Sequence, residues 1–401
     1  MSVRRRWQPV RGYGNRVYEP WERLVTLGVD LPSRAWTLAR GHRARVAPPL
    51  AGEDPQRVLV LRLDRIGDVV MSLSALSALR SRLPRAHVTL AVGSWAMEIA
   101  RSAPVDEVLE WNAPWVGRGV EGRDGWRRLL REAWRLRSRR LDLGIDFQGD
   151  PRAALLLRLT GARGRVGYAN AGGEALLTHV VPLDETLSWP EQNLLAVRRA
   201  LGDTPDGGFP SLVSDAEIAA ARERLPQARA PWVGIHPSGG RRVKEWPADR
   251  WSAVGRELLA QCGGSVIVTG SHDDRPLAQA IVAALGGSNT WDLTGELTLR
   301  QTLGVIAACD VFLSADTGPM HLAQALGTPS VSVFGPSDPA RYITSRDASR
   351  HVIVRPSLWC SPCNLIRRPP RECQDRVPEC LERVSVSEVV ASATTLLTRR
   401  V

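Results

Sequence analysis

The chain has 401 residues, enough for two α/β domains, and its hydrophobic content of 43% supports sizeable cores. Its formal net charge of +11 favours anionic partners such as phosphorylated ligands, anionic membranes or nucleic acid. No apolar run reaches the roughly 18 residues of a membrane-spanning helix, and no apolar segment of a secretory signal follows the basic start, so we expect a cytoplasmic protein.

The positive charge is concentrated in two segments. Residues 1–50 contain ten arginines without clear periodicity, so we expect a basic irregular extension there. Residues 115–140 contain nine arginines, with apolar residues at helical spacing between them. Such a helix could rest on anionic lipid, grip an acidic acceptor or simply present a solvated face. The sequence shows no zinc-finger spacing, RNP-like aromatic motif or internal repeat, so nucleic acid is not an expected partner.

Strands and helices alternate from residue 57 onwards. The nearly continuous apolar run at 58–63 is typical of a strand that is buried on both faces of a parallel sheet. A turn at 64–68 and a helix over 69–79 follow it. Further strands are expected at 88–92, 106–111 and 141–146, with helices at 95–101, 126–136 and 153–159. This alternation predicts a doubly wound parallel sheet.

A stretch rich in Gly, Pro, Asp and Ser at 202–216 interrupts this pattern and predicts a linker, which we place at 206–216. The alternation then restarts, with strands expected at 232–236, 265–269, 311–313 and 330–334. We therefore expect an α/β protein of two Rossmann-like domains that face each other across a cleft, with the loops at the carboxyl ends of the strands directed inward.

One polar turn combines the features of an anion site. Asp316, Thr317 and Gly318 lie between an apolar strand and a helical pattern that has Pro319 in its first turn. Free N–H groups and the helix dipole attract anions there, and Gly318 lets a ligand approach the backbone. His321 lies three residues further along, on the same helix face. The alternative is a helix that Asp316 or Thr317 merely caps.

Lys244 is the only lysine among 53 basic residues. A chain so biased towards arginine is expected to keep a lysine where a compact ammonium is needed, although chance survival is the alternative. With Ser238 and the turn from Asp316 to His321, Lys244 would stabilise a departing diphosphate.

Asp68 lies where the first strand meets the first helix. The helix dipole favours its charged form, so Asp68 could act as a general base towards a hydroxyl; a helix cap is the alternative. The sequence lacks a Gly-x-Gly-x-x-Gly turn after a strand, a nucleophile elbow and a Walker-type lysine loop. One base and one anion site therefore favour group transfer from a nucleotide-activated donor.

Six motifs in chain order carry a resemblance to a known family. They are Arg62-Leu-Asp-Arg-Ile-Gly-Asp-Val69, Asp146-Phe-Gln-Gly149, His236-Pro-Ser-Gly239 with Lys244-Glu-Trp-Pro247, Leu293-Thr-Gly295, Asp316-Thr-Gly-Pro-Met-His-Leu-Ala323 and Phe334-Gly-Pro-Ser-Asp-Pro339. Over roughly residues 57–395 the chain resembles glycosyltransferase family 9, the lipopolysaccharide heptosyltransferases. The resemblance implies a GT-B fold and an inverting, metal-independent mechanism without a required cofactor. It also implies a nucleotide-sugar donor, usually ADP-heptose, and a lipopolysaccharide-type or other glycan acceptor.

The resemblance also implies roles for single residues. Asp68 matches the general base, Lys244 the lysine at the donor phosphates and Ser238 a hydroxyl near them. The donor-binding motif matches Asp316, Thr317, Gly318 and His321. The acid that binds the donor ribose falls on Asp274, with Asp273 as the alternative. The implied domains are an acceptor-side domain at 51–205, a nucleotide-sugar-binding domain at 217–355, and a cysteine-containing tail with a closing helix at 356–401.

Two other functions fit the same architecture. The first is a non-catalytic module that binds a glycan or a membrane surface, and the second is a sugar-nucleotide epimerase. For the transferase, the expected partners are a nucleotide sugar, a glycan or lipid-linked acceptor, and the anionic inner face of the cytoplasmic membrane.

Four cysteines cluster near the end of the chain. Their Cys-x-x-Cys start could belong to a structural zinc site, but the later spacing is irregular, and stable disulfides are not expected in a reducing cytoplasm. A structural staple without metal is the alternative, and no metal is expected in the catalytic site. The four are Cys360, Cys363, Cys373 and Cys380.

Overall fold

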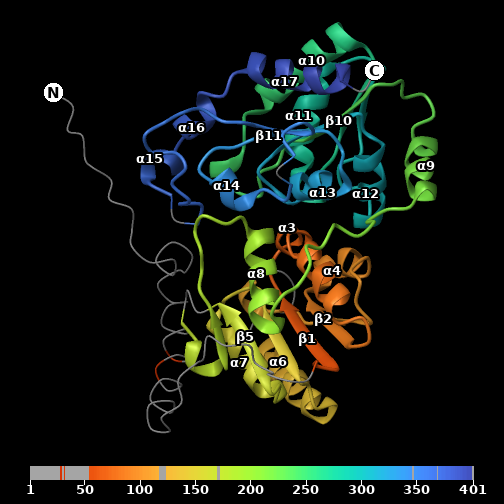
Figure 1. The fold of residues 1–401 in the computed structure, drawn as a ribbon. Coiled ribbons are helices and arrows are strands. Elements are labelled where there is room, and N and C mark those ends of the chain that lie inside the picture. Colours follow the sequence, from red (N-terminus) through yellow and green to blue (C-terminus); the bar gives the residue numbers. More distant parts are fainter. Residues whose placement is uncertain are drawn as a thin grey trace, which may run out of the picture. The chain divides into compact units, whose positions relative to one another are not determined.

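The computed structural model describes residues 54–116, 123–168, 172–345, 347–367 and 369–399, together with Gly28 and Leu31. Apart from these two residues, the basic extension expected over 1–50 lies outside the described residues. The chain divides into two compact units after Pro210 (Figure 1). Each unit has its own parallel sheet. Among the described residues, no helix is long and apolar enough to cross a bilayer.

The first unit contains six parallel strands in the order β3-β2-β1-β4-β5-β6. From Val58 to Arg62 the central strand β1 is buried, as its apolar sequence predicts. Val58 lies beside Val88 of β2 and beside Leu143 of β4. The strands are β1 Arg57–Arg62, β2 His87–Val92, β3 Glu107–Glu110, β4 Leu143–Asp146, β5 Gly164–Tyr168 and β6 His179–Val181.

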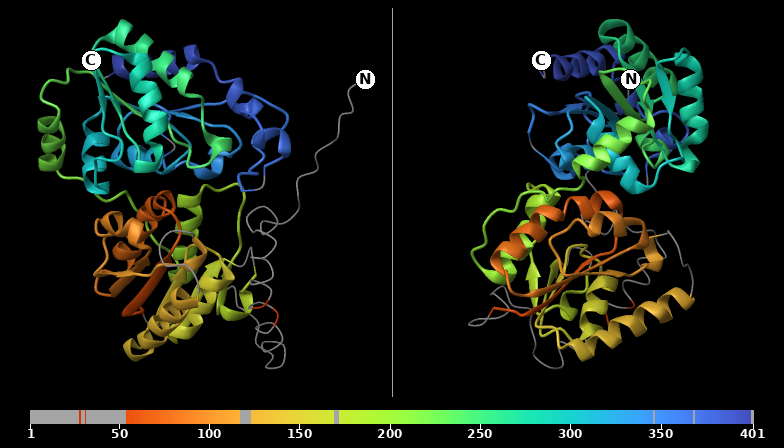
Figure 2. Two further views of the ribbon diagram at one scale, coloured as in Figure 1. Left: turned by 180° about the vertical axis from the view of Figure 1, so that it is seen from behind. Right: turned by 90° about the vertical axis from the view of Figure 1, so that its right-hand side faces the viewer.

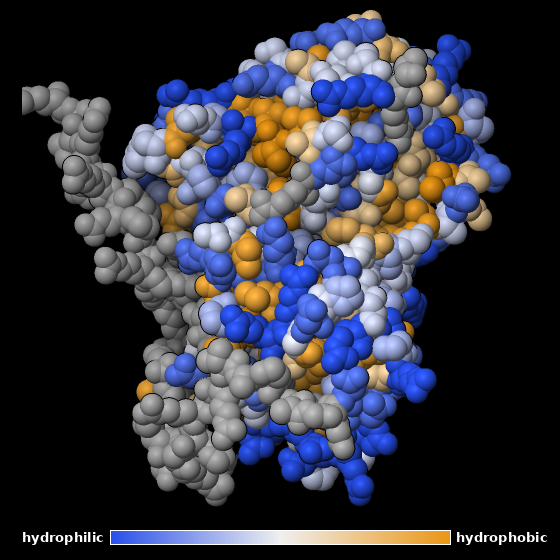
Figure 3. Space-filling model, in the orientation of Figure 1, coloured by the Kyte–Doolittle hydropathy of each residue, from blue (hydrophilic) through white to orange (hydrophobic). Residues whose placement is uncertain are grey.

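Helices cover both faces of this sheet (Figure 2). On one face, Leu129 and Leu156 from two helices pack against Leu59 and Leu61 of β1. The helices are α3 Ile66–Val70, α4 Leu73–Arg82, α5 Met97–Ala100, α6 Arg123–Arg135, α7 Pro151–Thr160 and α8 Trp189–Leu201. Figure 3 shows hydrophilic side chains over the end of this unit where Figure 1 labels α6.

The second unit contains six parallel strands in the order β12-β11-β10-β7-β8-β9. Its core includes Trp246 and Trp251, fully buried and edge to face with centroids 4.8 Å apart. The strands are β7 Trp232–His236, β8 Ser265–Val268, β9 Thr290–Asp292, β10 Val311–Ala315, β11 Ser330–Val333 and β12 His351–Val354. The helices are α9 Asp215–Arg224, α10 Ala248–Cys262, α11 Arg275–Leu285, α12 Leu299–Ala308, α13 Gly318–Leu326, α14 Pro339–Tyr342, α15 Arg371–Gln374, α16 Glu379–Glu382 and α17 Val386–Thr398.

The last helix belongs to the core of the second unit. Val389, Ala393 and Leu396 of α17 are buried in one cluster with Val233 of β7 and Leu313 of β10. Strands β7 and β10 therefore rest on a helix that comes more than fifty residues later in the chain.

In both sheets the direction in which strands are added reverses at the centre. The reversal lies between β1 and β4 in the first unit and between β7 and β10 in the second. In open parallel sheets, ligands bind beyond the carboxyl ends of the strands at such a reversal. The expected α/β class with two Rossmann-like domains is confirmed, and the reversals show where a site should lie in each unit.

Candidate active site

In the second unit, the predicted donor-binding residues follow three adjacent strands. Since β10, β7 and β8 are neighbours and parallel, their carboxyl ends lie at one edge of the sheet. After β7 come Ser238 and Lys244, and after β8 comes Asp274; after β10 come Asp316, Thr317, Gly318 and His321. The structure thus brings these residues to one edge, at the reversal between β7 and β10.

Lys244 and Asp316 form an ion pair across that reversal. The Lys244 Nζ lies 3.0 Å from the Asp316 Oδ2, and the two side chains are only 16% and 7% exposed. Burial raises the pKa of the Asp316 carboxyl, but the Lys244 ammonium, with smaller contributions from Ser337 and His321, brings it below its usual range. The lone lysine therefore has its Nζ at the end of β10, beside the predicted anion site.

The loop before Lys244 requires a glycine. A Cβ on Gly239 would lie 2.5 Å from both the carbonyl carbon and the carbonyl oxygen of Lys244. The Lys244 N–H also donates to the carbonyl of Arg241 at 2.8 Å, within a short 3-10 turn. These backbone contacts therefore fix the position of the Lys244 Cα, from which the side chain extends.

Helix α13 begins at the predicted turn. Thr317 precedes it in an extended conformation, Pro319 lies in its first turn, and Gly327 ends it at a φ of 71°. The Thr317 side chain makes no capping hydrogen bond. Asp316 is directed to Lys244, so the simple capping alternative does not describe this turn.

His321 connects α13 to a neighbouring loop. Its Nδ1 lies 2.8 Å from the Thr344 Oγ1, and its side chain is buried. On the same helix, Gln324 Oε1 accepts the N–H groups of Thr344 and Ser345 at 2.7 and 3.2 Å. Sequence reasoning missed Gln324 and Thr344, since nothing local indicates that the two segments meet.

Asp274 is part of a polar cluster at the end of β8. Its Oδ2 accepts both the N–H and the hydroxyl of Ser271 at 2.7 Å. Burial raises the pKa of Asp274, but hydrogen bonds from the Ser271 and Ser238 hydroxyls lower it by more. The net pKa of this carboxyl is therefore below its usual range. Burial also lowers the pKa of the adjacent His236 to about 4, so this imidazole is neutral at pH 7. Asp273 is exposed beside them.

In the first unit, Asp68 is the third residue of α3, and a buried arginine holds it. The Asp68 Oδ2 accepts the N–H of Arg65 at 3.2 Å, and its Oδ1 lies 3.6 Å from the Arg62 Nη2. Arg62 is 2% exposed, whereas the Asp68 side chain is 28% exposed. The Arg62 guanidinium also donates to the carbonyl oxygens of Asp68 and Phe147. Arg62 thus fixes the Asp68 carboxylate while the side chain stays partly exposed to solvent.

Two further carboxyl groups lie near Arg62, of which Asp146 is fully buried and Asp64 is 22% exposed. Burial raises the pKa of Asp64 to about 7, although the charge of Arg62 opposes this shift. Burial likewise raises the pKa of Asp146 to about 8, against two backbone N–H bonds from Gln148 and Gly149. Sequence reasoning named none of these as site residues. The detectable signal was Arg62 itself, a charged residue that ends an otherwise apolar strand.

The four tail cysteines are free thiols that lie within electrostatic range of one another. Burial raises the pKa of Cys380 to about 12, and the neighbouring Cys363, Cys373 and Cys360 add to the rise. Within the described ranges, no group of three or more His, Cys, Asp or Glu residues is arranged to hold a metal. The zinc site and the metal-free staple both stay predictions.

This fold and site define a glycosyltransferase of the GT-B class. The chain belongs to glycosyltransferase family 9 (heptosyltransferase), whose sequence model matches residues 127–370. The resemblance inferred from the six motifs is confirmed.

Known relatives and solved structures agree with this assignment. The chain is 29% identical over 302 residues to lipopolysaccharide heptosyltransferase 2 of Escherichia coli, covering 71% of this chain and 84% of that protein. It is 26% identical over 323 residues to lipopolysaccharide heptosyltransferase 1 of Pseudomonas aeruginosa, covering 77% of this chain and 86% of that protein.

The solved E. coli ADP-heptose heptosyltransferase II is similar in fold, with a TM-score of 0.69 at 22% identity over 86% of this chain and 99% of that one. A family 9 glycosyltransferase of Veillonella parvula gives a TM-score of 0.72 at 20% identity, covering 88% and 100%. The family favours glycosyl transfer over the binding-module and epimerase alternatives.

Proposed function

We propose that this enzyme transfers a heptose, or a related sugar, from a nucleotide diphosphate donor to a lipopolysaccharide-type or other glycan acceptor. ADP-heptose is the proposed donor, because the relatives are named lipopolysaccharide heptosyltransferases and one solved E. coli heptosyltransferase of similar fold holds ADP-2-deoxy-2-fluoro heptose. The observation that carries the proposal is the buried Lys244–Asp316 pair at the carboxyl edge of the second sheet.

The reaction proposed is a single displacement. Asp68 accepts the proton of the acceptor hydroxyl, whose oxygen attacks the anomeric carbon of the donor sugar. The bond from that carbon to the diphosphate oxygen breaks, and the electron pair stays on the diphosphate. The Lys244 ammonium and the N–H groups at the start of α13 stabilise the charge that develops there. Attack from the face opposite the leaving group inverts the anomeric centre, and no metal or cofactor takes part.

The remaining predicted residues would bind the donor. Ser238, Thr317 and Gly318 are proposed at the phosphates, and His321 at the same helix terminus. The donor ribose is proposed to bind Asp274 or, as the alternative, the exposed Asp273. Because Asp274 already accepts two hydrogen bonds from Ser271, ribose binding there would use its second oxygen.

The acceptor is proposed to be lipid-linked, so the enzyme would work in the cytoplasm at the anionic inner face of the membrane. The limits 51–205 and 217–355 are proposed for the acceptor-side and donor-side domains, joined by the linker 206–216. Residues 1–50 are proposed as an extension and 356–401 as a structural tail.

The test is transfer by purified enzyme with ADP-heptose and a glycan acceptor, monitored by mass spectrometry. Asp68→Asn should abolish transfer while ADP binding, measured by calorimetry, is unchanged. The exposed Asp203→Asn is the matched control in the same unit. Full activity of the Asp68 variant would remove this residue from the mechanism. Equal affinity for ADP, UDP and GDP would support the surface-binding alternative, and donor turnover without an acceptor would support the epimerase.

A further inference from the structure

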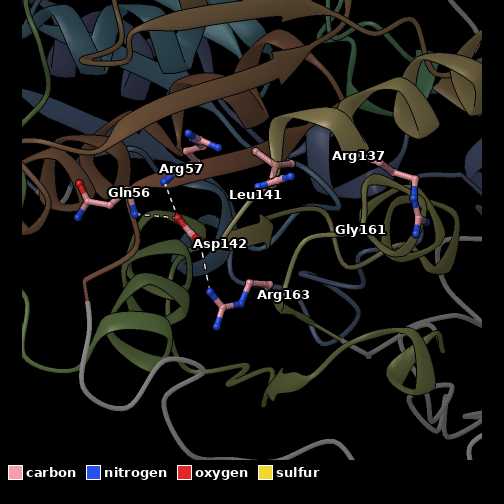
Figure 4. Close-up of a pocket in the computed structure, with 8 residues that line it drawn as sticks. Gln56, Arg57, Arg137, Leu141, Asp142, Gly161 and Arg163 are labelled. Carbon is pink, nitrogen blue, oxygen red and sulfur yellow. Dashed lines mark hydrogen bonds and ion pairs between the residues drawn. The ribbon is translucent and has the colours of Figure 1, made fainter.

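A basic cavity lies at the amino edge of the first sheet, where β1 and β4 begin and α7 ends (Figure 4). Its volume is about 560 Å³. Four of the lining residues are arginines and one is an acid. The lining residues are Gln56, Arg57, Arg137, Arg140, Leu141, Asp142, Gly161 and Arg163.

The single acid of this cavity, Asp142, already has partners within the protein. The Asp142 Oδ2 accepts the backbone N–H groups of Gln56 and Arg57, both at 3.0 Å, and its Oδ1 lies 3.8 Å from the Arg163 Nη1 (Figure 4). Arg57 donates to a backbone carbonyl. In the part of the chain that the structure describes, Arg137 and Arg140 have no hydrogen bond or ion pair from their side chains. The cavity therefore keeps uncompensated positive charge.

The outer face of α6 extends this charge. Leu129 and Ala133 on its inner face pack into the core of the first unit, as does Leu136 in the 3-10 turn that follows. The outer face exposes Arg127, Arg131 and Arg135, and the chain runs from there through a 3-10 turn to Arg137 and Arg140 at the cavity. We name the surface made of these arginines, Arg57, Arg163 and Trp134 the basic edge.

Trp134 gives the basic edge an apolar component. Its side chain is 62% exposed, whereas Leu129 and Ala133 of the same helix are buried. A soluble phosphate would gain nothing from an exposed indole. Tryptophan with surrounding arginine is instead typical of helices that lie in the headgroup layer of a membrane.

The basic edge is separate from the proposed active site. The cavity lies at Arg57, the first residue of β1, whereas Asp68 follows Arg62 at the other end. Six residues of strand span roughly 20 Å. An anion bound at Arg137 and Arg140 would therefore not be the donor or the reacting end of the acceptor.

We propose that the basic edge docks this enzyme on a bilayer that contains anionic phospholipids. A lipid phosphate enters the cavity between Arg137 and Arg140, the α6 arginines attract neighbouring headgroups, and Trp134 inserts at headgroup depth. The inference rests on the proposed function, because a lipid-linked acceptor would be located at a membrane. It assigns that contact to one surface of the first unit.

The experiment is flotation of the full chain with vesicles of phosphatidylcholine alone or with 30% phosphatidylglycerol. Wild type should bind the anionic vesicles at least tenfold more tightly, and 0.5 M NaCl should release it. The pocket variant R137Q/R140Q and the variant W134A should each lose at least tenfold in affinity. The matched control R85Q/R199Q removes the same charge from exposed positions of the same unit outside the basic edge and should bind like wild type.

Three outcomes would overturn the proposal. They are equal binding of wild type to both vesicles, full vesicle binding by R137Q/R140Q, and an equal loss in R85Q/R199Q. Calorimetry with inorganic phosphate gives a further outcome: tight binding of this ion without vesicle binding would assign the cavity to a soluble anion instead. Transfer from ADP-heptose to a delipidated glycan should be unchanged in R137Q/R140Q and W134A, so the result on vesicles is independent of the proposed function.

Discussion

Lys244 and Asp316, 72 positions apart in the chain, meet with their charged atoms 3.0 Å apart at the reversal point of the second sheet. The pair joins the ends of β7 and β10 and places a shielded ammonium beside the start of α13. In the proposed reaction, the departing diphosphate would therefore meet a cation whose position the fold already sets.

The first prediction separates stability from donor binding at this pair. Lys244→Ala leaves a buried carboxylate without its partner, so the free energy of unfolding should fall by on the order of 3 kcal/mol. The double variant K244A/D316N removes both charges and should recover most of that stability in chemical denaturation. Neither variant should bind ADP with wild-type affinity in calorimetry. Wild-type affinity in the double variant would exclude Lys244 from the donor site.

The second prediction concerns Arg62 as the residue that positions Asp68. A lysine in its place keeps the charge but cannot reach the carbonyls of Asp68 and Phe147 together. Misplacement of a reacting group by about 1 Å costs roughly 100-fold, so Arg62→Lys should lower kcat by about this factor with KM for the donor little changed. The control is Arg80→Lys, since Arg80 also bonds two backbone carbonyls in the same unit. It should lose stability but retain kcat, and an equal loss of kcat in both variants would make the role of Arg62 merely structural.

The third prediction tests the loop before Lys244. The added Cβ of Gly239→Ala collides with the Lys244 backbone, so the loop must shift and donor affinity should fall by roughly tenfold or more. In Gly208→Ala the new Cβ meets no atom within 4 Å, so this variant should behave like wild type. Isothermal calorimetry with ADP measures both. Unchanged affinity in the Gly239 variant would show that the lysine does not need this loop geometry.

The fourth prediction concerns stability against pH. Burial lowers the pKa of His351 to about 4, although the charge of Asp347 opposes the shift. Between pH 6.5 and pH 4 the unfolded chain binds a proton that the folded chain does not, so stability falls as the pH is lowered. The loss through His351 should reach up to about 3 kcal/mol at pH 4. Urea denaturation of His351→Gln should show a flatter pH dependence than wild type, whereas the exposed His87→Gln should not.

The sequence was informative about elements and less so about their contacts. The apolar runs predicted β1 and β10 to within two residues, because buried parallel strands are continuous in hydrophobicity. The single helix expected over 69–79 is in fact two, and α3 starts at Ile66, so Asp68 lies inside it. The cause is that the Arg65 N–H donates a hydrogen bond to the Asp68 side chain, a capping contact that lets the helix begin earlier.

Long-range partners could not be predicted in the same way. Arg62 bonds the carbonyl of Phe147, 85 residues later, because β1 and β4 become neighbours in the sheet. Lys244 was singled out by composition, since it is the only lysine, and the structure places it beside Asp316. The donor-binding role of these residues stays a prediction that the variants above test.

The position of α17 has a consequence for how the protein is made. Because Val389, Ala393 and Leu396 close the core on which β7 and β10 rest, that core stays open while the ribosome has yet to deliver residues 386–398. A nascent chain stalled before α17 would already carry Lys244 and the Asp316 turn without the support that holds them together. We therefore expect ADP binding by this unit only after synthesis has passed α17.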